Sequence, residues 1–84
     1  MPMSSDWYVY ILRCSDQSLY TGIAKDVETR LLQHNAGNGA RYTRSRLPVE
    51  LVYREEADGR SAALRREYAI KQMRSADKRR LIDG

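Results

Sequence analysis

The sequence lacks a second cysteine, any phenylalanine and any long apolar run. Its one cysteine, Cys14, cannot form an internal disulfide, and its apolar neighbours predict a small buried side chain in a reducing compartment. No stretch approaches the roughly 18 continuous apolar residues of a membrane-spanning helix. Residues 1–6 have neither the basic nor the apolar part of a leader peptide. We therefore expect a cytoplasmic protein.

Other familiar site patterns are also missing. With one cysteine and one histidine there is no zinc-binding spacing, and there is no glycine-rich phosphate loop or serine hydrolase arrangement. At 84 residues the chain has room for one domain, which we place over residues 1–84 with a core from about 6 to 83.

What the sequence does contain is arginine. Fifteen lysines and arginines face eleven acids, giving a net charge of +4. Arg41, Arg44 and Arg46 lie in a short stretch without acids, and a second basic group runs from residue 60 to residue 80. Because the guanidinium group binds phosphate through two parallel hydrogen bonds, this distribution indicates a polyanionic partner.

Local patterns predict an α+β domain in the order β-β-α-β-α-α, with helices flanking a three-stranded, mainly antiparallel sheet. Residues 7–14 and 19–23 have the composition of two strands joined by a turn. Asp26 is typical of a helix N-cap, and Gly37 and Gly39 of a helix end. A polar loop over 37–47, a strand over 49–53, a helix over 61–73 and a short helix from Ser75 complete the pattern.

The first two strands carry tyrosines in two triplets. Side chains alternate along a strand, so Tyr8 and Tyr10 share one face of the first strand, and Tyr20 and Gly22 share one face of the second. An odd-numbered loop would place Tyr10 and Tyr20 on the same face, and Asp16-Gln17 is a poor two-residue turn, which favours that longer loop. A glycine within a strand suggests a close approach to its backbone. From spacing alone, the simpler interpretation is that Tyr8, Tyr10 and Tyr20 are ordinary sheet aromatics.

The helices add three further candidates. Arg30 and His34 are spaced i, i+4 and lie beside the apolar stripe of the first helix, although a lone histidine is often a surface or capping residue. Glu67 lies among Ala63, Leu64 and Ile70 on the side of its helix that should face inward. A carboxylate there needs a partner, either a structural ion pair with Arg30 or Lys71 or a single magnesium ion.

Taken in order, these residues resemble the GIY-YIG nuclease superfamily, in particular its small stand-alone bacterial members. The two family motifs are matched by Tyr8-Val9-Tyr10 and Tyr20-Thr21-Gly22, and further family positions by Arg30, His34, Glu67 and the segment Gly39-Ala40-Arg41-Tyr42-Thr43. Tyr8 replaces the family's glycine and Thr21 its isoleucine. The late asparagine of some members has no counterpart, and neither has the extra DNA-binding domain of the larger ones.

The resemblance implies a metal-dependent endonuclease that hydrolyses DNA phosphodiester bonds in repair or processing. The implied catalytic residues are Tyr10, Tyr20, Arg30, His34 and Glu67, with Tyr8 and Gly22 in support. Glu67 would hold one Mg²⁺ or Mn²⁺ ion, and the nucleic acid would contact Arg41, Tyr42, Arg44 and Arg46. The expected partner is DNA, structured or single-stranded, with RNA left open, and no membrane. The sequence leaves the oligomeric state undetermined, with a monomer as the default.

Two other functions fit the same residues. One is a catalytically weak nucleic-acid-binding module that acts with a partner nuclease, and the other is a protein-interaction domain. The nuclease and the binding module both require salt-sensitive binding of nucleic acid, whereas the protein-interaction domain does not.

Overall fold

The computed structural model describes residues 6–84. Residues 1–5, on which the expectation about a leader peptide mainly rests, lie outside the described residues. Its sheet has three antiparallel strands in the order β2-β1-β3. Strand β1 (Trp7–Arg13) lies between β2 (Leu19–Ala24) and β3 (Glu50–Ala57). The α+β class and the order of the main elements are as predicted.

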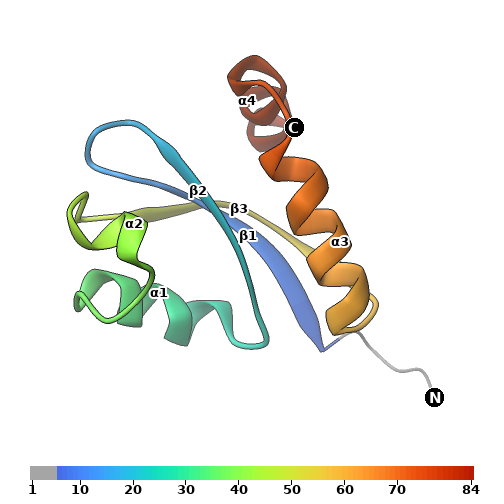
Figure 1. Cartoon of the computed structure of the whole chain (residues 1–84), viewed down its shortest axis with the longest axis horizontal. Coiled ribbons are helices and arrows are strands. Elements are labelled where there is room, and N and C mark those ends of the chain that lie inside the picture. Colours follow the sequence, from blue (N-terminus) through green and yellow to red (C-terminus); the bar gives the residue numbers. More distant parts are fainter. Residues whose placement is uncertain (1–5) are drawn as a thin grey trace.

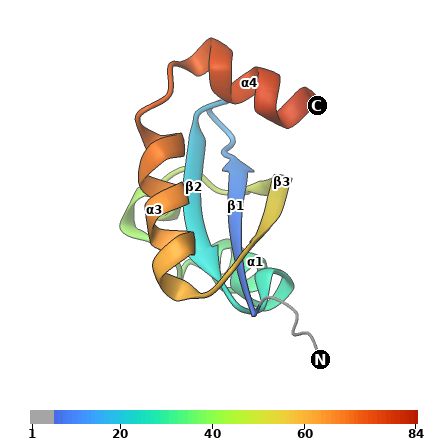
Figure 2. The same cartoon turned by 90° about the vertical axis from the view of Figure 1, so that its right-hand side faces the viewer.

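The two faces of the sheet carry different helices. Helices α1 (Val27–Asn35) and α2 (Arg41–Arg44) lie on one side, while α3 (Arg60–Lys71) and α4 (Ser75–Asp83) lie on the other (Figures 1 and 2). Because successive side chains of a strand point to opposite faces, β1 supplies both layers of the core.

The core accordingly divides into two clusters. Val9 and Ile11 pack with Ala63 and Ile70 of α3, on the α3 face. Tyr10, Leu12 and Cys14 pack with Val27 and Val49 on the α1 face. Burial of Cys14 agrees with the prediction from its apolar surroundings.

Helix α1 begins and ends at residues with clear local reasons. Asp26 caps its N-terminus by accepting a hydrogen bond from the Thr29 N–H over 3.0 Å, as predicted. At its end, Asn35 forms two hydrogen bonds with the backbone of Val49, accepting from its N–H at 2.8 Å and donating to its carbonyl at 3.0 Å. This amide therefore fixes α1 to the chain entering β3.

The structure corrects the extent of several elements. Strand β3 continues to Ala57, beyond the predicted end at Tyr53, because residues 55–57 pair with the start of β1. The charge of Glu55 is met there by Arg66 of α3, through hydrogen bonds of 2.7 and 3.2 Å. The basic loop contains the single turn α2, which no side-chain cap marks in the sequence.

Two leucines differ from their predicted positions. Leu32 follows Val27 at helical spacing, which predicts a place in the apolar repeat of α1, but its side chain is 72 % exposed. Leu64 is 39 % exposed, although its place between Ala63 and Glu67 predicted the inward side of α3. Within residues 6–84, none of the helices is both long and apolar enough to cross a bilayer.

Candidate active site

The hairpin register places the two candidate tyrosines on one face of the sheet. Tyr10 pairs with Gly22 and Leu12 pairs with Tyr20, so the side chains of Tyr10 and Tyr20 point the same way. Their ring centroids are 6.5 Å apart. The odd-numbered loop that this arrangement requires is present, because Arg13 pairs with Leu19 across five intervening residues.

Gly22 provides the space that Tyr10 occupies. A Cβ atom at residue 22 would lie 2.6 Å from the Tyr10 phenol oxygen and 2.7 Å from Cζ. Such distances are well inside van der Waals contact, so the ring lies directly against the glycine backbone. The close approach predicted for this strand glycine is made by Tyr10.

Tyr10 is connected to a fully buried histidine. Its phenol oxygen lies 3.0 Å from His34 Nε2, and His34 Nδ1 lies 2.9 Å from the Thr43 hydroxyl. That hydroxyl donates to the Ala40 carbonyl over 2.9 Å, so its oxygen is left to accept from Nδ1–H. We assign the tautomer from this network: Nδ1 carries the proton and Nε2 accepts from Tyr10. The Ala40 N–H also points toward Nδ1, but over 3.4 Å, too far to outweigh the shorter bonds.

Sequence reasoning missed two residues that hold His34. Thr43 is fully buried and supplies the partner of Nδ1. Gly39, predicted to end the first helix, is needed for space, since a Cβ there would lie 2.3 Å from His34 Nδ1 and 2.8 Å from the His34 Cα. Both belong to the Gly39–Thr43 segment that resembles the family, and that segment was the available signal.

Burial keeps Tyr10 and His34 neutral. It raises the pKa of the Tyr10 phenol to about 12, and the hydroxyl of Tyr20 and the carboxylate of Glu67 add to the rise, whereas a hydrogen bond and positive charge from Arg30 oppose it. Burial also lowers the pKa of His34 below its usual 6.5, and the charge of Arg30 lowers it further. At neutral pH an uncharged phenol therefore faces an uncharged imidazole.

Glu67 reaches this cluster from α3. Its carboxylate is close enough to affect the Tyr10 phenol and pairs with Lys71 over 3.2 Å, one turn further along the helix. An ion pair with Lys71 is one of the two structural alternatives that the sequence predicts for Glu67. Arg30 donates to the Gln33 side chain over 3.0 Å and contributes to the electrostatics of Tyr10 and His34.

The donors available for a metal ion are few. No group of three or more histidine, cysteine, aspartate or glutamate side chains comes together among residues 6–84. The Glu67 carboxylate is 18 % exposed and lies beside the tyrosines. This donor set fits magnesium, which commonly takes one or two carboxylates and completes its shell with water and substrate phosphate.

The predicted nucleic-acid contacts fall into two groups. Arg41 and Arg44 are exposed on α2 and form no ion pair with the acids of the described residues. Arg46 is bound within the protein. Its Nε donates to Asp16 over 3.1 Å, and one terminal nitrogen donates to the Tyr42 carbonyl over 2.8 Å. Its guanidinium carbon lies 3.9 Å from the centroid of the Tyr42 ring. Arg46 thus positions Tyr42.

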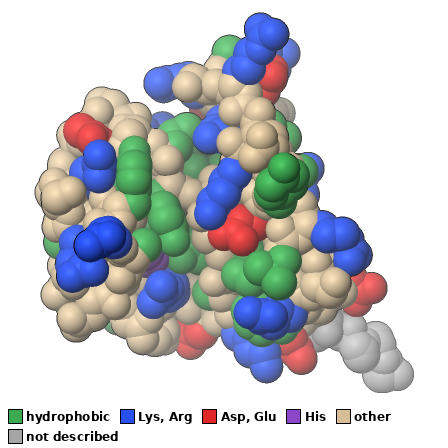
Figure 3. Space-filling model, in the orientation of Figure 1, with side chains coloured by type: hydrophobic (Ala, Val, Ile, Leu, Met, Phe, Trp, Pro, Cys, Tyr) green, Lys and Arg blue, Asp and Glu red, His purple; other side chains and the backbone are tan. Residues whose placement is uncertain are grey.

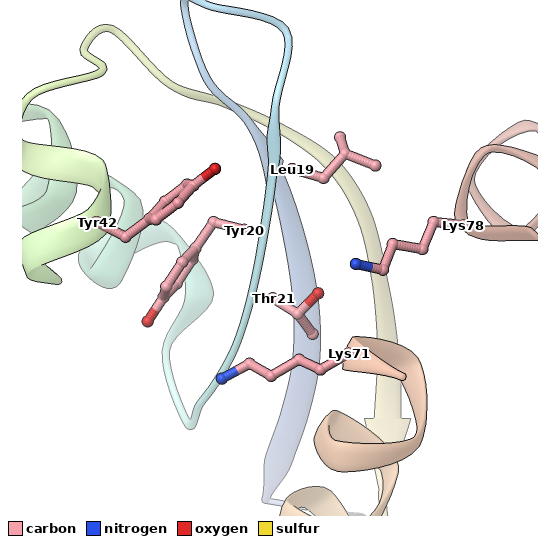
Figure 4. Close-up of a pocket in the computed structure, with 6 residues that line it drawn as sticks. All are labelled: Leu19, Tyr20, Thr21, Tyr42, Lys71 and Lys78. Atoms are coloured by element: carbon pink, nitrogen blue, oxygen red, sulfur yellow. The ribbon is translucent and has the colours of Figure 1, made fainter. Parts of the chain in front are cut away.

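A pocket opens beside the tyrosines. It has a volume of about 330 Å³ and is lined by Leu19, Tyr20, Thr21, Tyr42, Lys71 and Lys78 (Figure 4). The Tyr20 and Tyr42 rings face each other at 6.1 Å and 22°. The space-filling view shows the same face as a hollow between the α1–α2 and α3–α4 sides, with basic side chains along both (Figure 3).

Two hairpin tyrosines, an arginine and a histidine on the next helix, and a glutamate on α3 thus lie close together in the structure. The profile of the GIY-YIG catalytic domain matches residues 6–80, and the chain belongs to this family. The family is one of nucleases that typically depend on a divalent metal.

Relatives of similar length lie among the UPF0213 proteins. One from Natronomonas pharaonis is 52 % identical, and the match covers 95 % of this chain and 94 % of the relative. One from Staphylococcus saprophyticus is 55 % identical, and the match covers 89 % of this chain and 92 % of the relative. The solution structure of a UPF0213 protein from Bacillus halodurans is similar at a TM-score of 0.59, with 42 % identity over 92 % of this chain and 82 % of that one. The solution structure of a protein from E. faecalis is similar at a TM-score of 0.63, with 35 % identity, and the match covers 99 % of this chain and 88 % of that one.

Proposed function

We propose that this protein is a divalent-metal-dependent endonuclease that hydrolyses DNA phosphodiester bonds in repair or processing. The observation that carries the proposal is a cluster of five side chains from four elements, centred on the Tyr10 phenol. They are Tyr10, Tyr20, Arg30, His34 and Glu67. Phosphodiester hydrolysis needs a positioned water, charge stabilisation at the phosphoryl oxygens and help for the departing oxygen, and this group can supply each.

The two tyrosines differ in exposure, and we assign them different roles on that basis. Tyr10 is 1 % exposed and its hydroxyl donates to His34, so we assign it a positioning role at the floor of the site. Tyr20 is half-buried and lines the open pocket, where a substrate would lie. Tyr20 is therefore the tyrosine that would contact the attacking water.

The neutral histidine is suited to hold Tyr10. His34 Nε2 accepts the phenol proton, and its opposite nitrogen is fixed by Thr43. If the Tyr10 oxygen accepted a proton from the site, the phenol could pass its own proton to His34 Nε2 and remain neutral. His34 thus acts through Tyr10 and has no contact of its own with solvent.

Arg30 and Glu67 supply opposite charges to the same place. The planar guanidinium of Arg30 would bind the non-bridging oxygens of the scissile phosphate. Glu67 would hold one Mg²⁺ or Mn²⁺ ion together with the substrate phosphate. Bound there, the ion would neutralise the charge that develops on the phosphate and the leaving oxygen. Lys71, released from Glu67, would remain beside the nucleic acid.

The proposal is tested by substituting the two charged residues. Arg30→Ala and Glu67→Gln should each lower cleavage of nicked, branched or single-stranded DNA in Mg²⁺ or Mn²⁺ by about 10²-fold or more, because each removes charge stabilisation of the transition state. Glu56→Gln, at an exposed position on β3, is the matched carboxylate control and should cleave like wild type. Melting curves and circular dichroism would establish that all variants are folded.

The same assay separates the outcomes. Tyr20→Phe should lose more activity than Tyr10→Phe if the pocket-facing tyrosine contacts the water, and the reverse ranking would overturn that assignment. Equal cleavage by wild type and Glu67→Gln would rule out the metal role of Glu67. Salt-sensitive DNA binding without any metal-dependent cleavage would favour the alternative of a weak binding module that acts with a partner.

A further inference from the structure

A groove continues from the candidate active site toward α4. The pocket beside Tyr20 shares Leu19, Tyr42 and Lys78 with a second pocket of about 250 Å³, which is also lined by Ser75 and Arg79. Because three lining residues are common to both, the two pockets adjoin and form one continuous groove. We call it the α4 groove.

The walls of the α4 groove come from elements far apart in sequence. Tyr42 of α2 forms one side, residues 17–21 of the first hairpin form the floor, and α4 forms the other side. Lys78 extends from α4 with its amino group toward β2 (Figure 4). Ser75, Lys78 and Arg79 share one face of α4 because they are spaced i, i+3 and i+4.

The charges of this wall are unpaired. Lys78 and Arg79 form no ion pair with the acids of residues 6–84, whereas the neighbouring Arg80 is paired with Asp77 over 2.9 Å. At the other end of the groove, Lys71 lies 5.9 Å from the Tyr20 ring centroid. A chain of phosphates lying in the groove would therefore meet successive cations.

The aromatic wall offers a second kind of contact. The Tyr20 and Tyr42 centroids are 6.1 Å apart, so the nearly parallel rings overlap only in part, and Tyr42 is 39 % exposed. Arg46 fixes the Tyr42 ring by packing on it. Partly exposed aromatic rings beside a row of cations are the combination that binds single-stranded nucleic acid, because bases stack and phosphates pair.

We infer that the α4 groove binds a single-stranded nucleic-acid segment that runs from the scissile phosphate past Tyr42 to Lys78 and Arg79. The inference extends the proposed nuclease function, since it places the strand next to that site. Stacking on the exposed face of Tyr42 needs an unpaired base, because in a B-form duplex each base face is covered by the next base pair. The substrate class is therefore DNA or RNA with an unpaired arm.

The test compares two pairs of substitutions with the same loss of charge. Lys78→Gln with Arg79→Gln neutralises the groove wall. Arg65→Gln with Arg80→Gln is the control, because Arg65 bonds to Ser61 on α3 and Arg80 is paired with Asp77, and neither lines the groove. Fluorescence anisotropy with a 12-nucleotide DNA strand, its RNA counterpart and the blunt DNA duplex is measured in EDTA over a range of KCl concentrations.

Each phosphate contact to a single strand contributes about 0.7 to the slope of log K against log salt, so the groove pair should reduce that slope by about 1.4 and each single variant by about 0.7. The control pair and the duplex should show no change. An unchanged single-strand slope, or an equal loss for strand and duplex, would overturn the inference. The DNA and RNA arms identify which strand the groove accepts.

These measurements are independent of cleavage because EDTA removes the metal. A wild type that binds single strands through Lys78 and Arg79 but does not cleave in Mn²⁺ would refute the nuclease proposal and leave the groove standing. If the wild type cleaves but the groove variants bind single strands as well as the wild type does, the nuclease proposal would stand and the groove inference would be refuted.

Discussion

At the scale of single residues, the central feature is a histidine without solvent contact whose two ring nitrogens are both satisfied. Tyr10 and Thr43 hold the imidazole from opposite sides, and Gly39 leaves room for it. A buried, hydrogen-bonded and neutral imidazole is a rigid support for a phenol. It is also a group whose protonation must oppose folding.

We expect stability to fall with acid in the range where His34 titrates. The unfolded chain binds a proton on this side chain near pH 6.5, whereas burial lowers the folded-state pKa, so unfolding takes up a proton between the two values. The free energy of unfolding should therefore decrease as pH falls from about 7.5 through 6.5 and level off below the folded-state pKa. Urea unfolding at half-unit steps of pH measures this slope.

The control is His34→Gln, which lacks the titrating group and should be less stable but nearly independent of pH above about 5, since carboxylates titrate below that range. The chain has no other histidine to supply the same slope. Parallel pH profiles for wild type and His34→Gln would contradict the assignment.

How far the sequence predicts the site depends on whether a residue acts through local spacing. The shared face of Tyr10 and Tyr20 follows from strand alternation and the poor turn at Asp16-Gln17, and the structure confirms it. The partner of His34 could not be derived in this way, because Thr43 lies on the single turn α2, which reaches His34 only where Gly39 leaves room for the close approach. The engagement of Arg46 by Asp16 likewise joins segments 30 residues apart.

At the scale of elements, the site depends on how α1 and α2 are fixed against the hairpin. Asp16 in the β1–β2 loop pairs with Arg46, which follows α2, and Asn35 at the end of α1 bonds to the backbone before β3. The caps and strand lengths could be predicted approximately from composition. The single turn α2 could not, because its position is set by these contacts with distant segments.

Asn35→Ala should lower the free energy of unfolding by about 1–3 kcal/mol, because it leaves the N–H and carbonyl of the buried Val49 without their amide partner. Asn35→Asp should also be destabilising, since a carboxylate can accept from the N–H but repels the carbonyl oxygen. Urea unfolding curves measure both.

The exposed Asn38 three residues later provides the comparison, and Asn38→Ala should change stability by no more than ~0.5 kcal/mol. If Asn35→Ala were as stable as Asn38→Ala, the amide would not be what connects α1 to β3.

At the scale of the whole molecule, the arginines differ in whether they are paired. Arg54 bonds to Glu28 at 2.6 Å and Arg66 to Glu55 at 2.7 Å, joining helices to β3. Arg41 and Arg44 of α2 are exposed and form no ion pair within residues 6–84, and Tyr42 of the same turn lines the α4 groove. The net charge of +4 is thus less informative than its arrangement, because only unpaired cations are free to replace the counterions of a nucleic acid.

This arrangement predicts opposite effects for two double substitutions that remove the same charge. Arg41→Gln with Arg44→Gln should reduce the salt slope for single-stranded DNA by about 1.4, at about 0.7 per phosphate contact, with little change in melting temperature. Arg54→Gln with Arg66→Gln should leave the slope unchanged but lower the melting temperature, because Glu28 and Glu55 lose their partners. Anisotropy titrations and thermal melts on the same samples measure both quantities. Equal reductions of the slope by both pairs would mean that the protein binds DNA through net charge alone, and a wild type with no salt-dependent binding would favour a protein-interaction domain.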